Sequence, residues 1–101
     1  MIEVRVISLD LLKPLQQFFI TYDYGQKKRR AHLIVLEKKE AQIYAAFKVL
    51  GDDHYYDLPY KVVRFRKDQA LSVDDDIRLY YTDDDGEWIE INGINKIEVV
   101  S

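Results

Sequence analysis

The stretch KKEAQIYAAFKVL, residues 38–50, decides the fold class, because its composition favours a helix more than that of any other segment. It is rich in alanine and other good helix formers, and Ile43, Phe47 and Leu50 recur at spacings of four and three, which is typical of one helix face. Gly51 follows where a glycine commonly ends a helix. We therefore expect one packing helix near residues 38–50.

The segment before this stretch predicts a β-hairpin over residues 16–36. Gly25 supplies turn chemistry in its middle, because glycine adopts positive φ without strain. Side chains two apart on the first strand share one face, and these are Phe18, Ile20, Tyr22 and Tyr24.

A second hairpin is predicted further along the chain, from residues 77–82 and 87–92. The two alternating segments are joined by DDDG at residues 83–86, and Asp-Gly between such segments is a strong hairpin signal. Asn92-Gly93 predicts another turn after it.

Further short strands are predicted at residues 2–7, 62–66 and around Ile97 and Val99, where apolar and polar side chains alternate. The expected fold is therefore α+β: a small antiparallel β-rich single domain, residues 1–101, with two hairpins plus extra strands and one packing helix.

Size and composition point to one small globular domain, since the chain has 101 residues, of which 48% are hydrophobic and 33% charged. The absence of cysteine excludes disulfides, thiolate zinc sites and cysteine nucleophiles. No apolar run approaches the roughly 20 residues of a membrane helix. The N-terminal residues also lack a signal-peptide pattern. We expect a cytoplasmic protein that does not contact membranes.

Motifs for catalysis or cofactor binding are lacking. The four glycines are too far apart for the common phosphate-binding patterns, and the aspartates cluster in turns, where water keeps them ionised. His32 lies in an apolar segment and is expected to be a half-buried strand residue. We therefore expect no catalytic residues, no metal, no cofactor and no enzymatic activity.

Charge is divided unevenly along the chain, whose net charge is −3. Residues 1–50 carry nine Lys and Arg against five Asp and Glu, and residues 51–101 carry six against thirteen. The basic cluster is Lys27, Lys28, Arg29 and Arg30. The acidic residues of the second hairpin are Asp74, Asp75, Asp76, Asp83, Asp84, Asp85 and Glu87.

These acids lead to the main functional hypothesis, a non-enzymatic module that docks its acidic hairpin on a basic protein surface. Tyr80, Tyr81 and Trp88 would supply contact area, since aromatic residues often anchor interfaces. Trp88 alternates with Ile89 and Ile91 and therefore faces the opposite side of the strand, and we expect one of these two faces to be exposed. The narrower form of the hypothesis is an inhibitor that imitates nucleic acid to block a nucleic-acid-binding enzyme, as small proteins of phages and mobile elements do.

Two alternatives remain open. Opposite charge patches would allow a structural or adaptor subunit to associate with copies of itself as a homo-oligomer. The basic cluster, residues 27–30, would bind nucleic acid through its phosphates, although a pI of about 5.3 argues against this partner.

Overall fold

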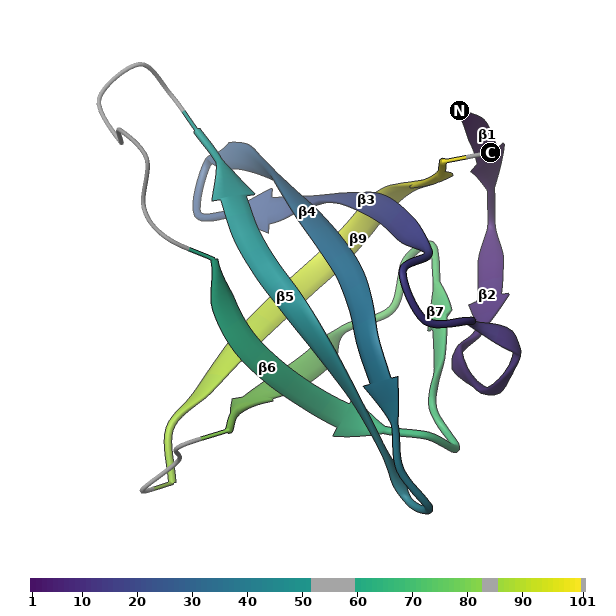
Figure 1. Cartoon of the computed structure of the whole chain (residues 1–101). Coiled ribbons are helices and arrows are strands. Elements are labelled where there is room, and N and C mark those ends of the chain that lie inside the picture. The colour runs from purple at the N-terminus through teal and green to yellow at the C-terminus, as the bar shows by residue number, and fades with distance from the viewer. Residues whose placement is uncertain (52–59, 83–85, 101) are drawn as a thin grey trace.

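The computed structural model describes residues 1–51, 60–82 and 86–100, and its main feature is a closed barrel of six antiparallel strands (Figure 1). Each strand pairs with the next around the barrel, and the last strand returns to pair with the first. In order around the barrel the strands are β3 (Gln17–Tyr24), β4 (Lys27–Lys38), β5 (Gln42–Leu50), β6 (Lys61–Arg66), β8 (Ile77–Tyr81) and β9 (Trp88–Val99).

Four shorter elements extend the barrel. Strand β1 (Ile2–Val4) pairs with the end of β9, which brings the two chain ends side by side (Figure 1). Strand β2 (Val6–Ser8) pairs with β7 (Ala70–Ser72), and the 3₁₀ turn η1 (Leu9–Leu11) follows β2. Because Leu9 is fully buried in the same apolar cluster as the barrel side chains, these elements belong to one core.

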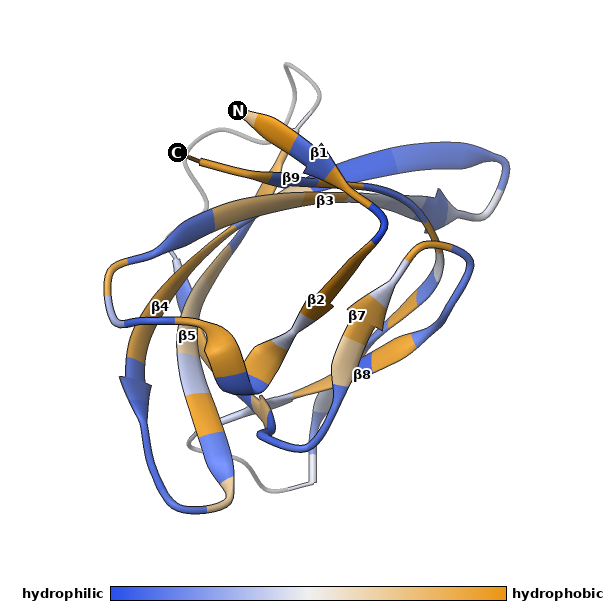
Figure 2. Ribbon diagram, turned by 90° about the vertical axis from the view of Figure 1, so that its right-hand side faces the viewer, coloured by the Kyte–Doolittle hydropathy of each residue, from blue (hydrophilic) through white to orange (hydrophobic). Residues whose placement is uncertain are grey.

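The barrel interior is filled by apolar side chains at every second position of its strands, and Figure 2 shows the resulting alternation of hydrophobic and hydrophilic bands. This is the period expected of strands with one face inward. The largest fully buried side chains include Phe18, Phe65, Ile20, Leu33, Ile43, Leu79, Ile91, Ile94 and Ile97.

The expected packing helix near residues 38–50 is wrong, because residues 42–50 form β5 between β4 and β6. Ile43, Ala45 and Phe47 are buried and the residues between them are not, which is a strand pattern. A spacing of four places Ile43 and Phe47 on one side of a strand as well as of a helix, so it did not distinguish the two. Pairing on both sides outweighs the helix propensity of alanine, which is below about 1 kcal/mol per residue. The fold is therefore nearly all β rather than α+β.

Both predicted hairpins are confirmed. Strands β3 and β4 pair along the whole of β3, and Gly25 has φ +61° in the turn between them. Strands β8 and β9 pair from Ile77↔Ile91 to Tyr80↔Trp88. Residues 83–85 of the second turn lie outside the described residues.

The turn expected at Asn92-Gly93 is instead an irregularity within β9, which continues to Val99. Gly93 has φ +59°, and the register between β3 and β9 shifts beside it, as in a β-bulge. The Gly93 N–H donates a hydrogen bond of 2.7 Å to the Asp76 carboxylate. The bulge allows β9 to leave β8 and continue along β3.

A side chain at position 93 should be costly, because its Cβ would overlap the carboxylate of Asp23 as well as strain the backbone. Gly25 has nearly the same φ, but no atom lies within 4 Å of the Cβ position. We expect Gly25→Ala to lower the free energy of unfolding by about 1 kcal/mol, and Gly93→Ala to lower it by about 0.5 kcal/mol more, because the exposed Asp23 side chain must rotate and give up its hydrogen bond from Asn95. Urea denaturation measures both.

The background variant Asp23→Ala separates overlap from backbone strain. In that background the two glycine substitutions should cost the same, because the overlapping group is gone. An undiminished difference between them would show that the Asp23 carboxylate is not the cause.

Leu15 occupies a turn position that favours glycine. The N–H of Gln16 donates to the carbonyl of Lys13 at 3.1 Å, Pro14 is the second residue of the turn, and Leu15 has φ 67°, as in a type II turn. Leu15 is 75% exposed, so removing its side chain takes little buried apolar surface from the folded protein. We expect Leu15→Gly to raise the free energy of unfolding by roughly 0.5 kcal/mol, because relief of strain exceeds the added entropy of the unfolded chain.

The control is Leu15→Ala, which keeps a Cβ and therefore the strained φ. Thermal or urea denaturation should show it within about 0.5 kcal/mol of the wild type and less stable than Leu15→Gly. Equal stability of the two variants would contradict the strain argument.

Candidate functional site

Trp88 and Tyr80 lie opposite each other on the outer wall of the barrel, where Trp88 is 49% exposed. The register continues across the wall, since Tyr80 pairs with Arg64 of β6 and Arg64 pairs with Tyr44 of β5. We call Tyr44, Arg64, Tyr80 and Trp88 the aromatic row. Of the two faces that alternation distinguished, the one that carries Trp88 is exposed and the one that carries Ile91 is buried.

Two guanidinium groups lie against the rings of this row. The Cζ atom of Arg78 is 4.7 Å from the ring centre of Trp88, and that of Arg64 is 5.9 Å from the ring centre of Tyr80. Arg64 also donates a hydrogen bond of 2.9 Å to the carbonyl oxygen of Tyr81. These contacts fix the arginines on the wall, with cation–π attraction adding to packing.

Tyr81 lies on the other side of β8 from Tyr80. It pairs with Val63, whose side chain is fully buried, and it packs against the core at one end of the barrel. The structure therefore separates two aromatic residues that the sequence grouped in one contact surface.

Those of the predicted acidic residues that the structure describes do not lie together. Glu87 is exposed beside Trp88, and Glu90 is exposed two residues further along β9. Asp83, Asp84 and Asp85 lie outside the described residues. The first triplet, residues 74–76, precedes β8 at the end away from Trp88, so β8 separates it from the aromatic row.

The first triplet is part of the barrel framework. The N–H of Asp74 donates to the carbonyl of Ile94 at 2.7 Å, and the N–H of Ile94 donates to the carbonyl of Asp75 at 3.1 Å. The Asp76 carboxylate accepts from Gly93, as described above. These bonds give the triplet a structural role at the β9 bulge.

The basic cluster is located at the start of β4, and strand alternation divides its arginines. Arg30 lies over the ring of Phe19, with Cζ 4.1 Å from the ring centre, and forms an ion pair of 3.2 Å with Glu98. Arg29 lies over the ring of Tyr24 at 3.5 Å and lines a cavity at one end of the barrel. Lys27 and Lys28 are exposed.

His32 is the centre of a polar cluster on the outer face of β3 and β4, and it is half-buried as predicted. Its ring stacks on Phe19 with ring centres 4.6 Å apart. Its Nε2 lies 2.9 Å from Oε1 of Gln17, which can only accept, so Nε2 carries the hydrogen. Its Nδ1 lies 2.7 Å from the hydroxyl of Tyr60, which donates to the neutral ring.

Burial lowers the pKa of His32 below its ordinary value of 6.5, and the positive charges of Arg30 and Lys48 lower it further. The folded state therefore binds a proton at this site less readily than the unfolded state does. The contribution of neutral His32 to the free energy of unfolding should therefore be fully present above pH 6.5. It should be lost as the pH drops from 6.5 through the lower pKa of the folded state.

The variant His32→Gln tests this pH dependence. The free energy of unfolding, measured by urea denaturation between neutral and mildly acidic pH, should fall less steeply in His32→Gln than in the wild type. Parallel pH profiles for the two proteins would show that His32 does not titrate differently on folding.

A cavity of about 230 Å³ opens at the end of the barrel where Arg29 lies. Its polar lining includes the phenol groups of Tyr22, Tyr24 and Tyr81, together with Arg29 and Lys61. We call it the barrel mouth. The Nζ of Lys61 donates to the hydroxyl of Tyr81 at 3.2 Å, and burial raises the pKa of Tyr22 above its ordinary value of 10.0.

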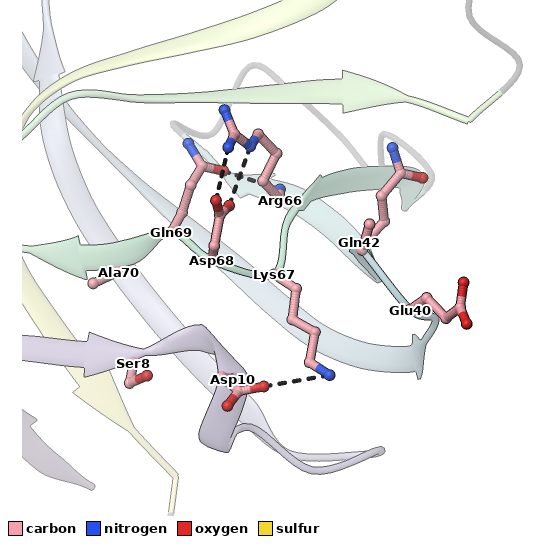
Figure 3. Close-up of a pocket in the computed structure, with 10 residues that line it drawn as sticks. Ser8, Asp10, Glu40, Gln42, Arg66, Lys67, Asp68, Gln69 and Ala70 are labelled. Carbon is pink, nitrogen blue, oxygen red and sulfur yellow. Dashed lines mark hydrogen bonds and ion pairs between the residues drawn. The ribbon is translucent and has the colours of Figure 1, made fainter.

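A larger open groove, about 560 Å³, lies beside η1 and the ends of β5 and β6 (Figure 3). Its two cations, Arg66 and Lys67, are both paired with carboxylates of the groove. Arg66 makes two contacts with Asp68, of 3.1 and 2.7 Å, and Lys67 lies 3.4 Å from Asp10 (Figure 3). Because both cations are already paired, the groove offers no unpaired positive charge from its lining to attract an anionic ligand.

Within the described part of the chain, no three His, Asp or Glu side chains come together as a metal site would require. No helix among those residues is long and apolar enough to cross a membrane. No protein family model, curated protein or solved structure matches this chain. The aromatic row and the barrel mouth are therefore the two features of the structure from which a function can be inferred. The sequence indicated only part of the mouth, through the alternation that placed Tyr22 and Tyr24 on one face.

Proposed function

We propose that this protein is a non-enzymatic, cytoplasmic binding module that docks the outer wall of its β8–β9 hairpin on a basic protein surface. The observation that carries the proposal is the half-exposed Trp88 opposite Tyr80, with Arg78 and Arg64 against the two rings. Trp, Tyr and Arg are the residues in which energetically dominant interface positions are enriched.

The core does not require these rings, which supports an interface role. Leu79 and Ile91 of the same hairpin are buried, at 1% and 0% exposure, and fill the barrel from the inner face. Trp88 projects from the opposite face, where a smaller polar residue would serve solubility as well. An exposed indole in this position is best explained by a partner that covers it.

Charge around the row supports a basic partner. Glu87 and Glu90 are exposed on β9 or next to it, and the sequence adds Asp83, Asp84 and Asp85 to the same turn. Acidic residues at the rim of an interface speed association with a positive surface and discourage negative ones. Inhibition of a nucleic-acid-binding enzyme by imitation of nucleic acid is the narrower form of this proposal. In this form, the acidic residues of the β8–β9 turn would take the place of the nucleic-acid phosphates, and the first triplet would not take part.

The alternative functions receive less support. Nucleic-acid binding through residues 27–30 requires a continuous basic surface, but Arg29 and Arg30 lie on opposite faces and Arg30 is paired with Glu98. Self-association through opposite charges has a smaller acidic patch to use, because the Asp76 carboxylate is bonded to the β9 bulge and Asp74 pairs with Arg5 of the same chain.

The proposal is tested by affinity capture from nuclease-treated lysate, comparing the wild type with Trp88→Ala and with Tyr60→Ala. Tyr60 is a matched control, because it is a 42% exposed aromatic residue elsewhere on the molecule. A basic protein retained by the wild type and Tyr60→Ala should be lost with Trp88→Ala. With the purified partner, Trp88→Ala should weaken binding by about 2 kcal/mol, or roughly thirtyfold.

A second pair of variants tests the charges. Asparagine at residues 83–85 should slow association and reduce its dependence on salt, whereas asparagine at Asp74 and Asp75 should not. Retention of every partner by Trp88→Ala would overturn the proposal. Capture of nucleic acid in the absence of nuclease, lost on neutralising residues 27–30, would favour the nucleic-acid alternative.

A further inference from the structure

We propose that the barrel mouth binds a small aromatic carboxylate, at a site separate from the aromatic row. The barrel interior is filled by side chains, so a ligand has room at the mouth rather than along the barrel axis. A volume of about 230 Å³ corresponds to about eight water volumes of ~30 Å³, enough for a benzoate-sized ligand of about nine non-hydrogen atoms.

The charge of the mouth selects an anion. Among the described residues, three cations line it, Arg29, Lys48 and Lys61, against one carboxylate, that of Glu90, in a chain whose net charge is −3. Within the described residues, no carboxylate lies within ion-pair distance of Arg29 or Lys61, whereas Arg30 and Arg66 are both paired. Among the residues that the structure describes, no ion pair therefore neutralises the positive charges of Arg29 and Lys61 at the mouth.

The position of Arg29 suits a planar anion. Its guanidinium lies flat enough over Tyr24 for the ring centre to be 3.5 Å from Cζ, which leaves the N–H groups at its edges directed away from the ring. Such an edge binds a carboxylate through two parallel hydrogen bonds. Lys61, held by its hydrogen bond to Tyr81, supplies a second positive charge across the opening.

The remaining lining suits an aromatic ring. Phe47, Val49 and Ile89 contribute apolar surface, and the phenol rings of Tyr22 and Tyr81 contribute aromatic surface. The Tyr22 hydroxyl stays protonated at neutral pH, because burial raises its pKa, so it is able to donate to a bound carboxylate. An anion without a ring would leave most of this surface uncovered.

The test uses the full chain, labelled with ¹⁵N, titrated with sodium benzoate, benzamide and inorganic phosphate at neutral pH. Benzamide has the same shape as benzoate without the charge, and phosphate has the charge without the ring. Benzoate should bind at least tenfold more tightly than either, with chemical-shift changes concentrated on residues of the mouth such as Tyr22, Arg29 and Tyr81.

Variants then test which cations bind the carboxylate of benzoate. Arg29→Gln combined with Lys61→Gln should weaken benzoate binding at least tenfold, whereas Lys28→Gln, which removes an exposed cation outside the mouth, should not change it. Circular dichroism confirms that each variant is folded. Arg29→Lys provides a second check, because it retains the charge and loses the two-bond geometry, and it should bind at an intermediate affinity.

Each other outcome overturns the proposal. Absence of saturable benzoate binding at tens of millimolar removes the site, and equal binding of benzamide removes the role of charge. Tighter binding of phosphate removes the aromatic ligand class. Shift changes centred on Trp88 and Tyr80 would instead place the ligand on the aromatic row, a result that leaves the docking proposal to be tested separately.

Discussion

The pairing of β9 with β3 closes the barrel, and the other features of the molecule depend on it. Strand β9 is 12 residues long, and it pairs first with β8 and then with β3. It passes from one partner to the other at the bulge around Gly93, where positive φ and the absence of a Cβ allow the Asp23 side chain to lie close. Without this closure, β3 and β9 would each expose an unpaired backbone edge.

Closure also fixes which side chains point outward, because strand side chains alternate with a period of two. Residues that are adjacent in sequence therefore lie on opposite faces. Tyr80 belongs to the outer wall and Tyr81 to the barrel mouth, and Arg30 belongs to the outer wall and Arg29 to the mouth. A cluster of like residues along a strand is consequently two half-clusters in space, which is why the basic cluster at the start of β4 does not form a single patch.

The hairpins could be predicted because their signals are local. A turn glycine and alternating side chains on both sides are enough to define two paired strands. The identity of β5 could not be predicted in this way, because Ile43 and Phe47 fit both periods and the choice is made by pairing with strands β4 and β6. The assignment to a strand thus depended on long-range contacts, which outweigh local propensity.

The candidate sites also differ in whether local sequence or long-range strand pairing determines them. Trp88 was predictable as an outward residue, since its neighbours Ile89 and Ile91 define the inner face. The barrel mouth was not, because it combines Arg29 of β4, Lys61 of β6 and Tyr81 of β8, and their proximity depends on register around the closed barrel. The role of the first triplet was also hidden, since its hydrogen-bond partners are backbone groups of β9.

The electrostatics of the two surfaces suit different partners on physical grounds. The field of a chain with net charge −3 opposes the approach of a polyanion at distances beyond contact, but salt screens that field over about 8 Å under physiological conditions. A small monoanion inside the mouth is within a few ångströms of Arg29 and Lys61, so the local cations outweigh the net charge. The negative net charge that repels a polyanion attracts a basic protein. A protein of that kind can reach Trp88 on the outer wall, but it is too large to enter a cavity of about 230 Å³. Size and sign of charge together would therefore make the two proposed sites selective for different classes of molecule.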